Sequence, residues 1–507
     1  MRAHNFVLRS HNIVLRARNL LAACVLAAAC YSPSPPAGAY QCSTVDKSCP
    51  SGQHCTCGLC VKSDDQAACS FTLTATLPAS GTVGEHEQFP MTLQALDQNG
   101  ANANGFNGTV ALSSSWGDVV PSSVALVNGQ AQAMVALNRE TLPPQTATVT
   151  AAFGGNKGSV GKIGVRAQTF IRDTNAIVPT PTGTATFGFA DTVVAEPNVI
   201  ITSVGQYRMY FGGYAQSQQY KGYNFGVATS TDGVTFTPSP DPVFKTPAMP
   251  ANAQINSPSV FGVGPNWYLA FSQGMMGVVN GQDGWLAGPS PDGVSMFPAI
   301  GPIVSRTSCG YCDTTVDFPS VIPDPAGNGG YIMFFSAGHA MGSASIAEIG
   351  RASAGPDGQT FTPEPAPLLS SDLANEAVLL APRVIVDGTV FKMWYSYART
   401  QDISDLQNLC NANNKIHIGY ATSSDGFYWV RSPSNPAVEV GPCGTAAKPR
   451  TCWDDDSPAI LSGSVVPLDG KSTTSGFALY YTTFRTVSLG ILGNYCVPSG
   501  IGRATRP

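Results

Sequence analysis

Short runs in which apolar and polar residues alternate cover most of the chain beyond residue 70. Val, Thr, Ser, Tyr and Phe fill these runs, and Gly, Pro, Asn and Asp separate them. Alternation with a period of two is typical of strands that bury one face, and the separating residues are those that turns favour. No long amphipathic helical pattern interrupts the runs. The sequence therefore predicts an all-β protein.

The first part of the pattern, residues 70–167, predicts a small antiparallel β-sandwich. Alternating segments such as 71–76 and 147–151 are separated by turn clusters. Residues 106–110, Phe-Asn-Gly-Thr-Val, and 127–131, Val-Asn-Gly-Gln-Ala, resemble bacterial immunoglobulin-like repeats of the invasin or filamin type. Such modules usually act as spacers, so this resemblance implies an Ig-like domain and says little about chemistry.

The remaining region, residues 168–507, repeats one pattern five times. Each unit begins with a short strand that contains a proline, at positions 197, 258, 319, 382 and 458. An aromatic strand follows; four units then carry a Gly-x-Ala strand, and four carry an Asp-Gly turn. Four strands per unit and five units predict a five-bladed β-propeller. The last unit lacks a fourth strand, so residues 168–190 are predicted to close the ring.

Five units with this order of strands and turns resemble the arabinanase, levansucrase and invertase-like superfamily. That group includes glycoside hydrolase families 43 and 32 and the mannoside phosphorylases. The resemblance covers residues 168–507, and it is specific for the architecture rather than for one activity. It implies carboxylates at the starts of the innermost strands, where they line a central funnel.

Three of the Pro-containing strands carry a carboxylate one or two residues before the proline. These are Glu196 in the first unit, Asp317 in the third and Asp456 in the fifth. Glycoside cleavage needs two carboxyl groups across a pocket, one as acid and one as base or nucleophile. The three are therefore the candidate catalytic residues. The alternative is that each caps a strand start or pairs with Arg383.

The units also depart from the family pattern. The families usually carry Asp where Glu196 stands, and their acid motifs Glu-Gly-Pro and Glu-Cys-Pro are absent. Arg383 occupies the fourth unit where a carboxylate is expected, and the nearest acid there is Glu376. The second unit offers only Asn256. These departures weigh against hydrolysis.

The loops after the second strands are predicted to open on the same end of the propeller as these carboxylates. Sugar-binding sites use aromatic side chains and polar side chains that make paired hydrogen bonds, and functional residues are concentrated in such loops. The polar and aromatic residues of these loops are therefore candidate substrate-binding groups. His339 is the most distinctive of them. The candidates in these loops are Tyr214, Gln273, His339, Arg399 and Arg485. Arg383, in the fourth Pro-containing strand, is a sixth candidate.

The N-terminus resembles a bacterial lipoprotein signal. Four arginines precede an apolar run over residues 20–29, and Cys30 follows directly. This arrangement is typical of a secretory signal, and the run is too short to span a bilayer. Residues 26–30, Leu-Ala-Ala-Ala-Cys, resemble a lipobox. They predict a signal peptide over residues 1–29, lipidation of Cys30, export and membrane anchoring. Ordinary cleavage that leaves Cys30 free is the alternative.

The cysteine count favours Cys30 over Cys24 as the anchor. Of 14 cysteines, cleavage removes Cys24 and lipidation uses Cys30, which leaves six in residues 42–69 and six in the C-terminal region. Even counts suit disulfides in an oxidising compartment. Residues 30–69 are thus predicted to form a Pro-rich tether and a disulfide knot of open connectivity. A zinc site in the Cys-x-Cys-x-x-Cys run at 55–60 is the alternative.

In the C-terminal region, Cys309 and Cys312 are expected to form a structural disulfide, because no βα context of a redox motif surrounds them. Cys443 and Cys452 bracket a short loop and are expected to pair with each other. Cys410 and Cys496 then remain.

The net charge of −5, with no basic stripe, argues against a nucleic-acid partner. Asp454, Asp455 and Asp456 offer clustered oxygens of the kind Ca²⁺ prefers, but a solvated acidic turn is the expectation. No cofactor and no metal are predicted. The sequence thus predicts an exported, surface-anchored, glycan-acting protein that resembles a glycoside hydrolase. The alternative is a non-catalytic lipoprotein that binds glycans or displays the propeller.

Overall fold

The computed structural model of the chain describes residues 40–43, 48–167, 169–179, 189–190, 192–203, 205–215, 222–245, 253–275, 281–341, 344–371, 376–399, 415–441, 452–471, 476–488 and 494–506. The predicted signal peptide, Cys30 and nearly all of the tether lie outside these residues. Strands dominate the described part, which contains one short 3-10 helix, η1 (Asp64–Gln66), and no α-helix. The all-β prediction is confirmed. No helix in the described part is long and apolar enough to cross a membrane.

A small disulfide-bonded segment precedes the sandwich. It contains the hairpin of β1 (His54–Thr56) and β2 (Leu59–Val61), followed by η1. Its three disulfides are Cys42–Cys55, Cys49–Cys60 and Cys57–Cys69. A segment this small buries little apolar surface, so covalent bridges stabilise it. The predicted knot is confirmed, and the zinc alternative is wrong because all three of its cysteines are disulfide-bonded.

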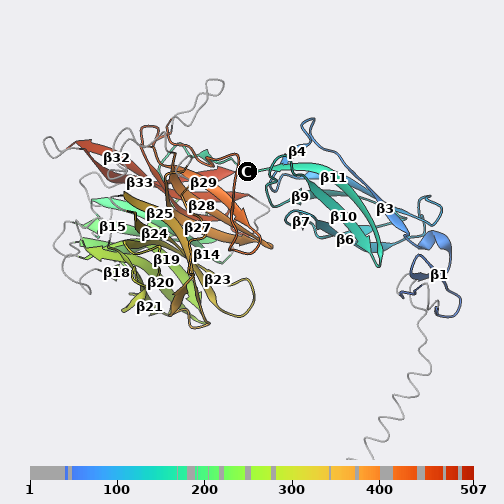
Figure 1. The fold of residues 1–507 in the computed structure, drawn as a ribbon, viewed down its shortest axis with the longest axis horizontal. Coiled ribbons are helices and arrows are strands. Elements are labelled where there is room, and N and C mark those ends of the chain that lie inside the picture. Colours follow the sequence, from blue (N-terminus) through green and yellow to red (C-terminus); the bar gives the residue numbers. More distant parts are fainter. Residues whose placement is uncertain are drawn as a thin grey trace, which may run out of the picture.

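Residues 70–167 form two packed sheets with one core, and all but one of their strand pairs are antiparallel (Figure 1). In β5 (Phe89–Leu96), every second side chain is buried, as the alternating pattern predicts. One sheet has the order β3 (Ser70–Ala75), β5, β9 (Gln130–Leu137) and β7 (Val119–Val120). The other has the order β4 (Thr82–Gly84), β11 (Asn156–Arg166), β10 (Ala147–Phe153), β6 (Gly108–Ser114) and β8 (Ser123–Leu126).

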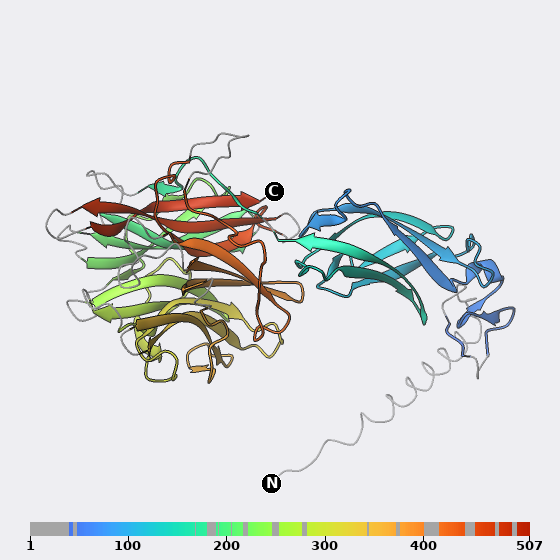
Figure 2. The same cartoon turned by 45° about the horizontal axis from the view of Figure 1, so that its top comes forward.

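The rest of the described chain forms five sheets, here called sheets 1 to 5 (Figure 2). In sheets 1 to 4 the strands follow one another in sequence order. Sheet 1 comprises β14 (Val193–Ser203), β15 (Gln206–Ala215), β16 (Gly222–Ser230) and β17 (Thr237–Pro238), and β18 (Phe244–Lys245) also pairs with β16. Sheet 2 comprises β19 (Ala253–Val263), β20 (Asn266–Met275), β21 (Asp283–Ser290) and β22 (Ala299–Val304). Sheet 3 comprises β23 (Thr315–Pro323), β24 (Tyr331–Met341), β25 (Ala344–Ala354) and β26 (Phe361–Pro363).

Sheets 4 and 5 complete the set. Sheet 4 comprises β27 (Val378–Asp387), β28 (Val390–Ala398), β29 (His417–Ser423) and β30 (Val430–Arg431). Sheet 5 comprises β31 (Ile460–Pro467), β32 (Phe477–Ser488) and β33 (Asn494–Arg506), and its outer positions are filled by β12 (Ile171–Arg172) and β13 (Val178–Pro179), which pair with β33. The predicted closing segment is therefore confirmed.

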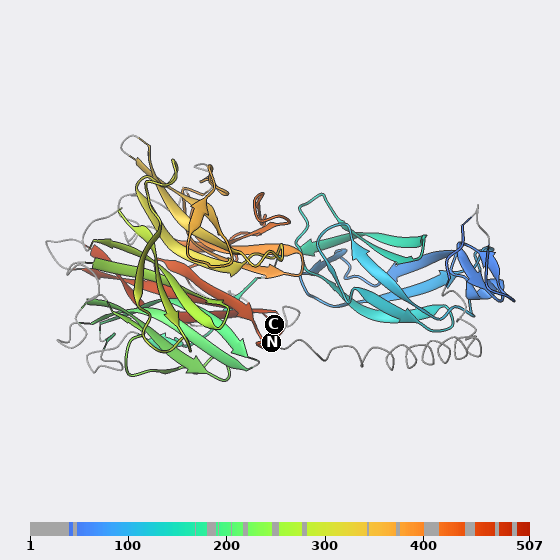
Figure 3. The same cartoon turned by 90° about the horizontal axis from the view of Figure 1, so that it is seen from below.

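The five sheets form a closed, propeller-like ring. The first strand of each sheet contacts the first strand of the next, from β14 through β19, β23 and β27 to β31, and β31 returns to β14. Five apolar clusters fill the five junctions between neighbouring sheets. Figure 3 shows the ring of strands beside the elongated sandwich.

Each inner strand carries a β-bulge near its start, where one extra residue interrupts the ladder. In sheets 1 to 4 the bulge includes the residue before the proline, and that residue has a left-handed φ of 50–58°. In sheet 5 the bulge lies at Gly463 in β31, which begins only at Ile460. Pro458 is therefore not equivalent to the other four prolines, and the fifth unit departs from the predicted alignment.

The bulges lock neighbouring sheets together. A bulged residue does not use its N–H in its own ladder, and in four junctions this N–H donates to a hydroxyl on the second strand of the preceding sheet. We call these bonds the first interlock. They join Ser272 to Phe318 at 3.0 Å, Ser336 to Ala381 at 2.8 Å, Ser396 to Ser462 at 2.8 Å and Thr482 to Glu196 at 2.6 Å.

The sandwich docks on sheet 4 through a buried cluster of charges. Lys392 Nζ lies 3.0 Å from the Asp387 carboxylate and 3.5 Å from the Glu85 carboxylate of the sandwich. His86 Nε2 lies 2.8 Å from Asp387, and the Tyr420 hydroxyl donates to Glu85 at 3.0 Å. All five side chains are buried. Charges taken out of water need such mutual pairing, so this cluster fixes how the sandwich is attached.

We predict that Lys392→Met lowers the free energy of unfolding by about 3–5 kcal/mol, because it leaves two buried carboxylates without their shared cation. Denaturant unfolding measures the effect. Lys415→Met, at an exposed lysine, is the matched control and is expected to change stability little. Equal stability of the two variants would contradict the prediction.

Candidate functional site

The strand register brings the predicted loop residues to the same end of the ring as the inner-strand starts. Val193 at the start of β14 pairs with Tyr214 at the end of β15, and Val378 pairs with Ala398 in the same way. Sheets 2, 3 and 5 repeat the arrangement. The candidate carboxylates of the inner strands and the loops after the second strands therefore share one end of the ring.

Glu196 replaces a hydroxyl in the first interlock. Sheets 2 to 5 carry Ser or Thr at one position of the second strand, but sheet 1 has Gly212 there. The Glu196 carboxylate fills this gap, since a Cβ on Gly212 would lie 3.3 Å from Glu196 Oε2. The same oxygen accepts the N–H of Ser257 at 2.6 Å. One oxygen of Glu196 thus closes the junction between sheets 1 and 2.

Asp317 lies on β23, immediately before the bulged residue Phe318. Its Oδ1 accepts the Phe318 N–H at 2.7 Å, and the Ser272 hydroxyl also hydrogen-bonds to it. The equivalent positions in the neighbouring sheets 2 and 4 are Asn256 and Leu380, and neither of these side chains is charged. Asp317 is therefore a departure from the repeat, as Glu196 is.

A second set of hydrogen bonds between neighbouring sheets, here called the second interlock, is made by the first residue after each bulge. Arg383 interrupts this set. In the other four sheets this residue accepts an N–H from the next inner strand, at 2.7–3.3 Å. These acceptors are Asn198, Ser259, Ser320 and Ser464. Arg383 holds the equivalent place in β27, is 3% exposed, and donates from Nη1 to the carbonyl of Pro319 at 2.5 Å.

Glu196, Asp317 and Arg383 act on one another electrostatically, although they come from three sheets. Burial, followed by the charge of Asp317, raises the pKa of Glu196 to about 7. Burial raises the pKa of Asp317 to about 6, and burial lowers the pKa of Arg383 to about 10 against the pull of both carboxylates. Glu196 and Asp317 are partly buried and keep some accessible surface.

An aromatic pair flanks Glu196. The ring centroids of Tyr214 and Tyr223 are 4.9 Å apart in an edge-on arrangement. Burial raises the pKa of the Tyr223 hydroxyl, and the charge of Glu196 raises it further. Sequence analysis named Tyr214 but missed Tyr223, which lies at the start of the third strand and has no counterpart in the repeat motif.

The structure does not bring Asp456 to this group. Its side chain is exposed in the turn before β31, and the position equivalent to Glu196 in sheet 5 is Ser462. Of the same acidic run, Asp454 is buried, 3.0 Å from Arg172 of the closing strand β12 and 3.0 Å from the Tyr481 hydroxyl. The expected solvated turn is thus only partly correct, because Asp454 helps to fasten the end of the ring.

Glu376 has a structural role. Its Oε1 accepts the Tyr395 hydroxyl at 2.8 Å and its Oε2 accepts Arg431 Nε at 2.5 Å. Both oxygens of this buried carboxylate are therefore engaged, and it braces sheet 4.

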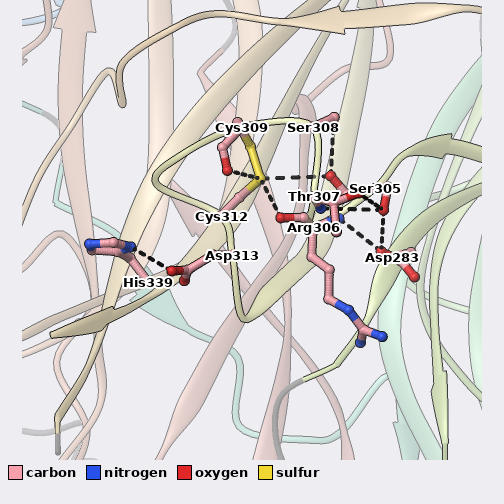
Figure 4. The surroundings of a disulfide bond; sticks show 9 residues. All are labelled: Asp283, Ser305, Arg306, Thr307, Ser308, Cys309, Cys312, Asp313 and His339. Carbon is pink, nitrogen blue, oxygen red and sulfur yellow. Dashed lines mark hydrogen bonds and ion pairs between the residues drawn. A yellow bond between two sulfur atoms is a disulfide. The ribbon is translucent and has the colours of Figure 1, made fainter. Parts of the chain in front are cut away.

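The candidate substrate-binding residues in the loops after the second strands, here called the mouth residues, differ in their surroundings. His339 Nδ1 lies 3.3 Å from the Asp313 carboxylate. Figure 4 shows this pair beside the Cys309–Cys312 disulfide. Asp283 accepts the N–H of Arg306 in the same loop at 2.8 Å. The disulfide and this bond together fix the loop that carries Asp313. The predicted structural disulfide is confirmed.

The remaining mouth residues are less constrained. Arg399 lies 3.4 Å from Glu439, Arg485 is exposed, and Gln273 Oε1 is buried without a hydrogen-bond partner in the described structure. Cys452 is disulfide-bonded. Cys410 and Cys443 lie outside the described residues, so the two other expected pairings stay predictions.

No protein-family model matches the chain, and no curated protein sequence matches it. Several solved structures resemble the chain at low similarity. A thermostable family-43 glycoside hydrolase is 16% identical, with a TM-score of 0.43 over 64% of this chain and 90% of its own. A glycoside hydrolase is 13% identical, with a TM-score of 0.47 over 66% and 93%. An endo-arabinase from Bacteroides thetaiotaomicron VPI-5482 is 16% identical, with a TM-score of 0.38 over 62% and 96%. Likeness at this level assigns neither activity nor substrate.

We predict that Glu196→Ala lowers the free energy of unfolding by about 1–3 kcal/mol, because the buried Ser257 N–H loses its acceptor. Adding Gly212→Ser to this variant supplies the hydroxyl that the other sheets use, and most of the lost stability should return. Thermal unfolding of the single and double variants measures this. A double variant as unstable as Glu196→Ala would contradict the interlock role.

Proposed function

We propose that the ring is a five-bladed β-propeller whose central hollow cleaves glycosidic bonds, and that the sandwich is an immunoglobulin-like spacer. The observation that supports this most is the pair of carboxyl groups with unequal raised pKa values, Glu196 and Asp317, beside a buried arginine. Pairs of titratable groups whose environments separate their pKa values are typical of acid–base catalysis.

The pair supplies both roles that glycoside cleavage needs. Glu196, with the higher pKa, is the general acid: its proton passes to the glycosidic oxygen as the bond from that oxygen to the anomeric carbon breaks. Asp317, ionised at lower pH, is the base or the nucleophile. It either takes a proton from the attacking water or bonds to the anomeric carbon, and water then releases the sugar. Tyr214 and Tyr223 offer an aromatic wall beside the acid.

We propose further that the protein is exported and anchored through a lipid on Cys30. The disulfides of residues 42–69 and the Cys309–Cys312 bridge support export, because such bonds form and persist in oxidising compartments. The Pro-rich tether then holds the folded domains away from the membrane.

A non-catalytic role in glycan binding or display is the second candidate. One observation favours it: Glu196 Oε2 already serves the junction between sheets 1 and 2, which accounts for the residue without catalysis. The third candidate acid, Asp456, lies outside the group. The two candidates differ in a single measurable respect, which is product release.

We predict that the purified protein releases sugars from some member of a panel of plant and microbial polysaccharides. Glu196→Gln and Asp317→Asn each remove an ionisable group while keeping an acceptor oxygen, and each is expected to lower the rate at least about 100-fold. Asp456→Asn is expected to retain activity. Chromatography of the products measures release. No release from any glycan by the folded protein would favour the binding role, and loss of activity in Asp456→Asn would contradict the assignment of the pair.

We predict a narrow bell-shaped dependence of kcat/KM on pH, with its maximum between pH 6 and 7. Below about pH 6 Asp317 takes up a proton and ceases to act as base, and above about pH 7 Glu196 loses the proton that it must donate. The two apparent values belong to the coupled pair. A rate that stays constant from pH 5 to pH 9 would exclude these roles.

A further inference from the structure

Arg383 carries an unused pair of hydrogen-bond donors. Its Nη1 binds the Pro319 carbonyl, but Nε and Nη2 are buried and have no partner among the described residues. These two nitrogens lie on the same edge of a guanidinium, where their N–H bonds point in parallel. The side chain is 3% exposed, so bulk water does not bathe this edge. An unmatched buried donor is costly, and a buried charged one more so.

Nε and Nη2, here called the Arg383 fork, belong to the same site as the two carboxyl groups. The Pro319 carbonyl that holds Nη1 lies on β23 two residues after Asp317, and the guanidinium interacts electrostatically with Asp317 and Glu196. Neither carboxylate hydrogen-bonds to Nε or Nη2. The repeat gives no structural reason for an arginine here, because Ser or Asn fills this place in the other four sheets.

We propose that this Arg383 fork binds the carboxylate of an acidic sugar, so that the protein acts on glycans that contain uronic-acid residues. The inference rests on the proposed function for the nature of the site. Two parallel N–H donors match the two oxygens of a carboxylate, and such charge-assisted pairs are about twice as strong as neutral ones. A carboxylate brings one negative charge toward Glu196 and Asp317, whereas a phosphate dianion brings two and is repelled more strongly.

Calorimetric binding tests the proposal without turnover. The probes are oligosaccharides of galacturonic and glucuronic acid, each compared with the neutral galactose or glucose oligosaccharide of the same length and linkage. The unmodified sequence and its Glu196→Gln variant are both expected to bind the acidic member at least about tenfold more tightly. Arg383→Lys keeps the charge but loses the fork, and should retain a preference of only a few-fold; Arg383→Gln should show none.

Arg208→Gln is the matched control. Arg208 lies on β15 and donates to the Asp292 carbonyl in the Asp-Gly turn of sheet 2, away from the two carboxyl groups. It should keep the full preference. Thermal unfolding of each variant shows whether it is folded before binding is compared.

Proton linkage supplies a readout that a merely structural arginine would not change. An anion placed beside Glu196 and Asp317 disfavours their ionised forms, so acidic sugars should bind with proton uptake and more tightly at pH 6 than at pH 8. Neutral sugars should show little of this dependence.

The outcomes separate this inference from the proposed function. Equal affinity for acidic and neutral sugars, or a preference that survives in a folded Arg383→Gln variant, overturns the inference. Release of neutral sugars alone overturns it too, while the hydrolase proposal stands. A strong acidic preference without any product release supports the inference and rejects hydrolysis. Inorganic phosphate that competes as well as the uronic acids would replace the acidic sugar with a general oxyanion, and so overturn it.

Discussion

The hydrogen bond from a bulged N–H to the neighbouring sheet is the constraint on which the ring depends. Apolar clusters fill the five junctions, but apolar packing is not directional and does not by itself set the register of one sheet against the next. A donor that has left its own ladder must find an acceptor when it is buried. The bulge therefore converts a local irregularity of each inner strand into a fixed geometry between sheets. The left-handed φ before the proline in sheets 1 to 4 is the local cost of that arrangement.

The candidate site arises where this repeating constraint is met in an unusual way. At one junction Gly212 leaves no hydroxyl, and a carboxylate crosses the gap instead. At another position a small acceptor is replaced by Arg383, which turns back to the Pro319 carbonyl. Both substitutions put charge where the other sheets have short neutral side chains. In a fold built from near-identical units, such breaks in symmetry mark the residues whose chemistry the scaffold alone does not require.

Much of the fold was predictable from the sequence because strand alternation, Asp-Gly turns and the proline spacing are local signals. The closing role of residues 168–190 followed from counting strands. The fifth unit was misaligned because Pro458 resembles the other prolines, whereas equivalence is set by the bulge at Gly463, which has no proline. That error is what placed Asp456 among the candidates. Glu196, Asp317 and Arg383 were found because they flank the recurring prolines. Their partners were missed, although a signal was present: an aromatic residue precedes Gly212 and each of Ser272, Ser336, Ser396 and Thr482.

The attachment of the sandwich bears on how the site is presented. Asp387 lies at the end of β27, and its partner in the register, Val390, begins β28. The buried charge cluster that docks the sandwich is therefore at the end of the ring opposite to the inner-strand starts, where Glu196 and Asp317 lie. The disulfide knot is joined to the far side of the sandwich (Figure 2). A lipid anchor ahead of that knot, as proposed, would hold the ring by the end opposite to these carboxylates. In that proposed arrangement, the charge-paired joint would keep Glu196 and Asp317 on the side of the ring away from the sandwich.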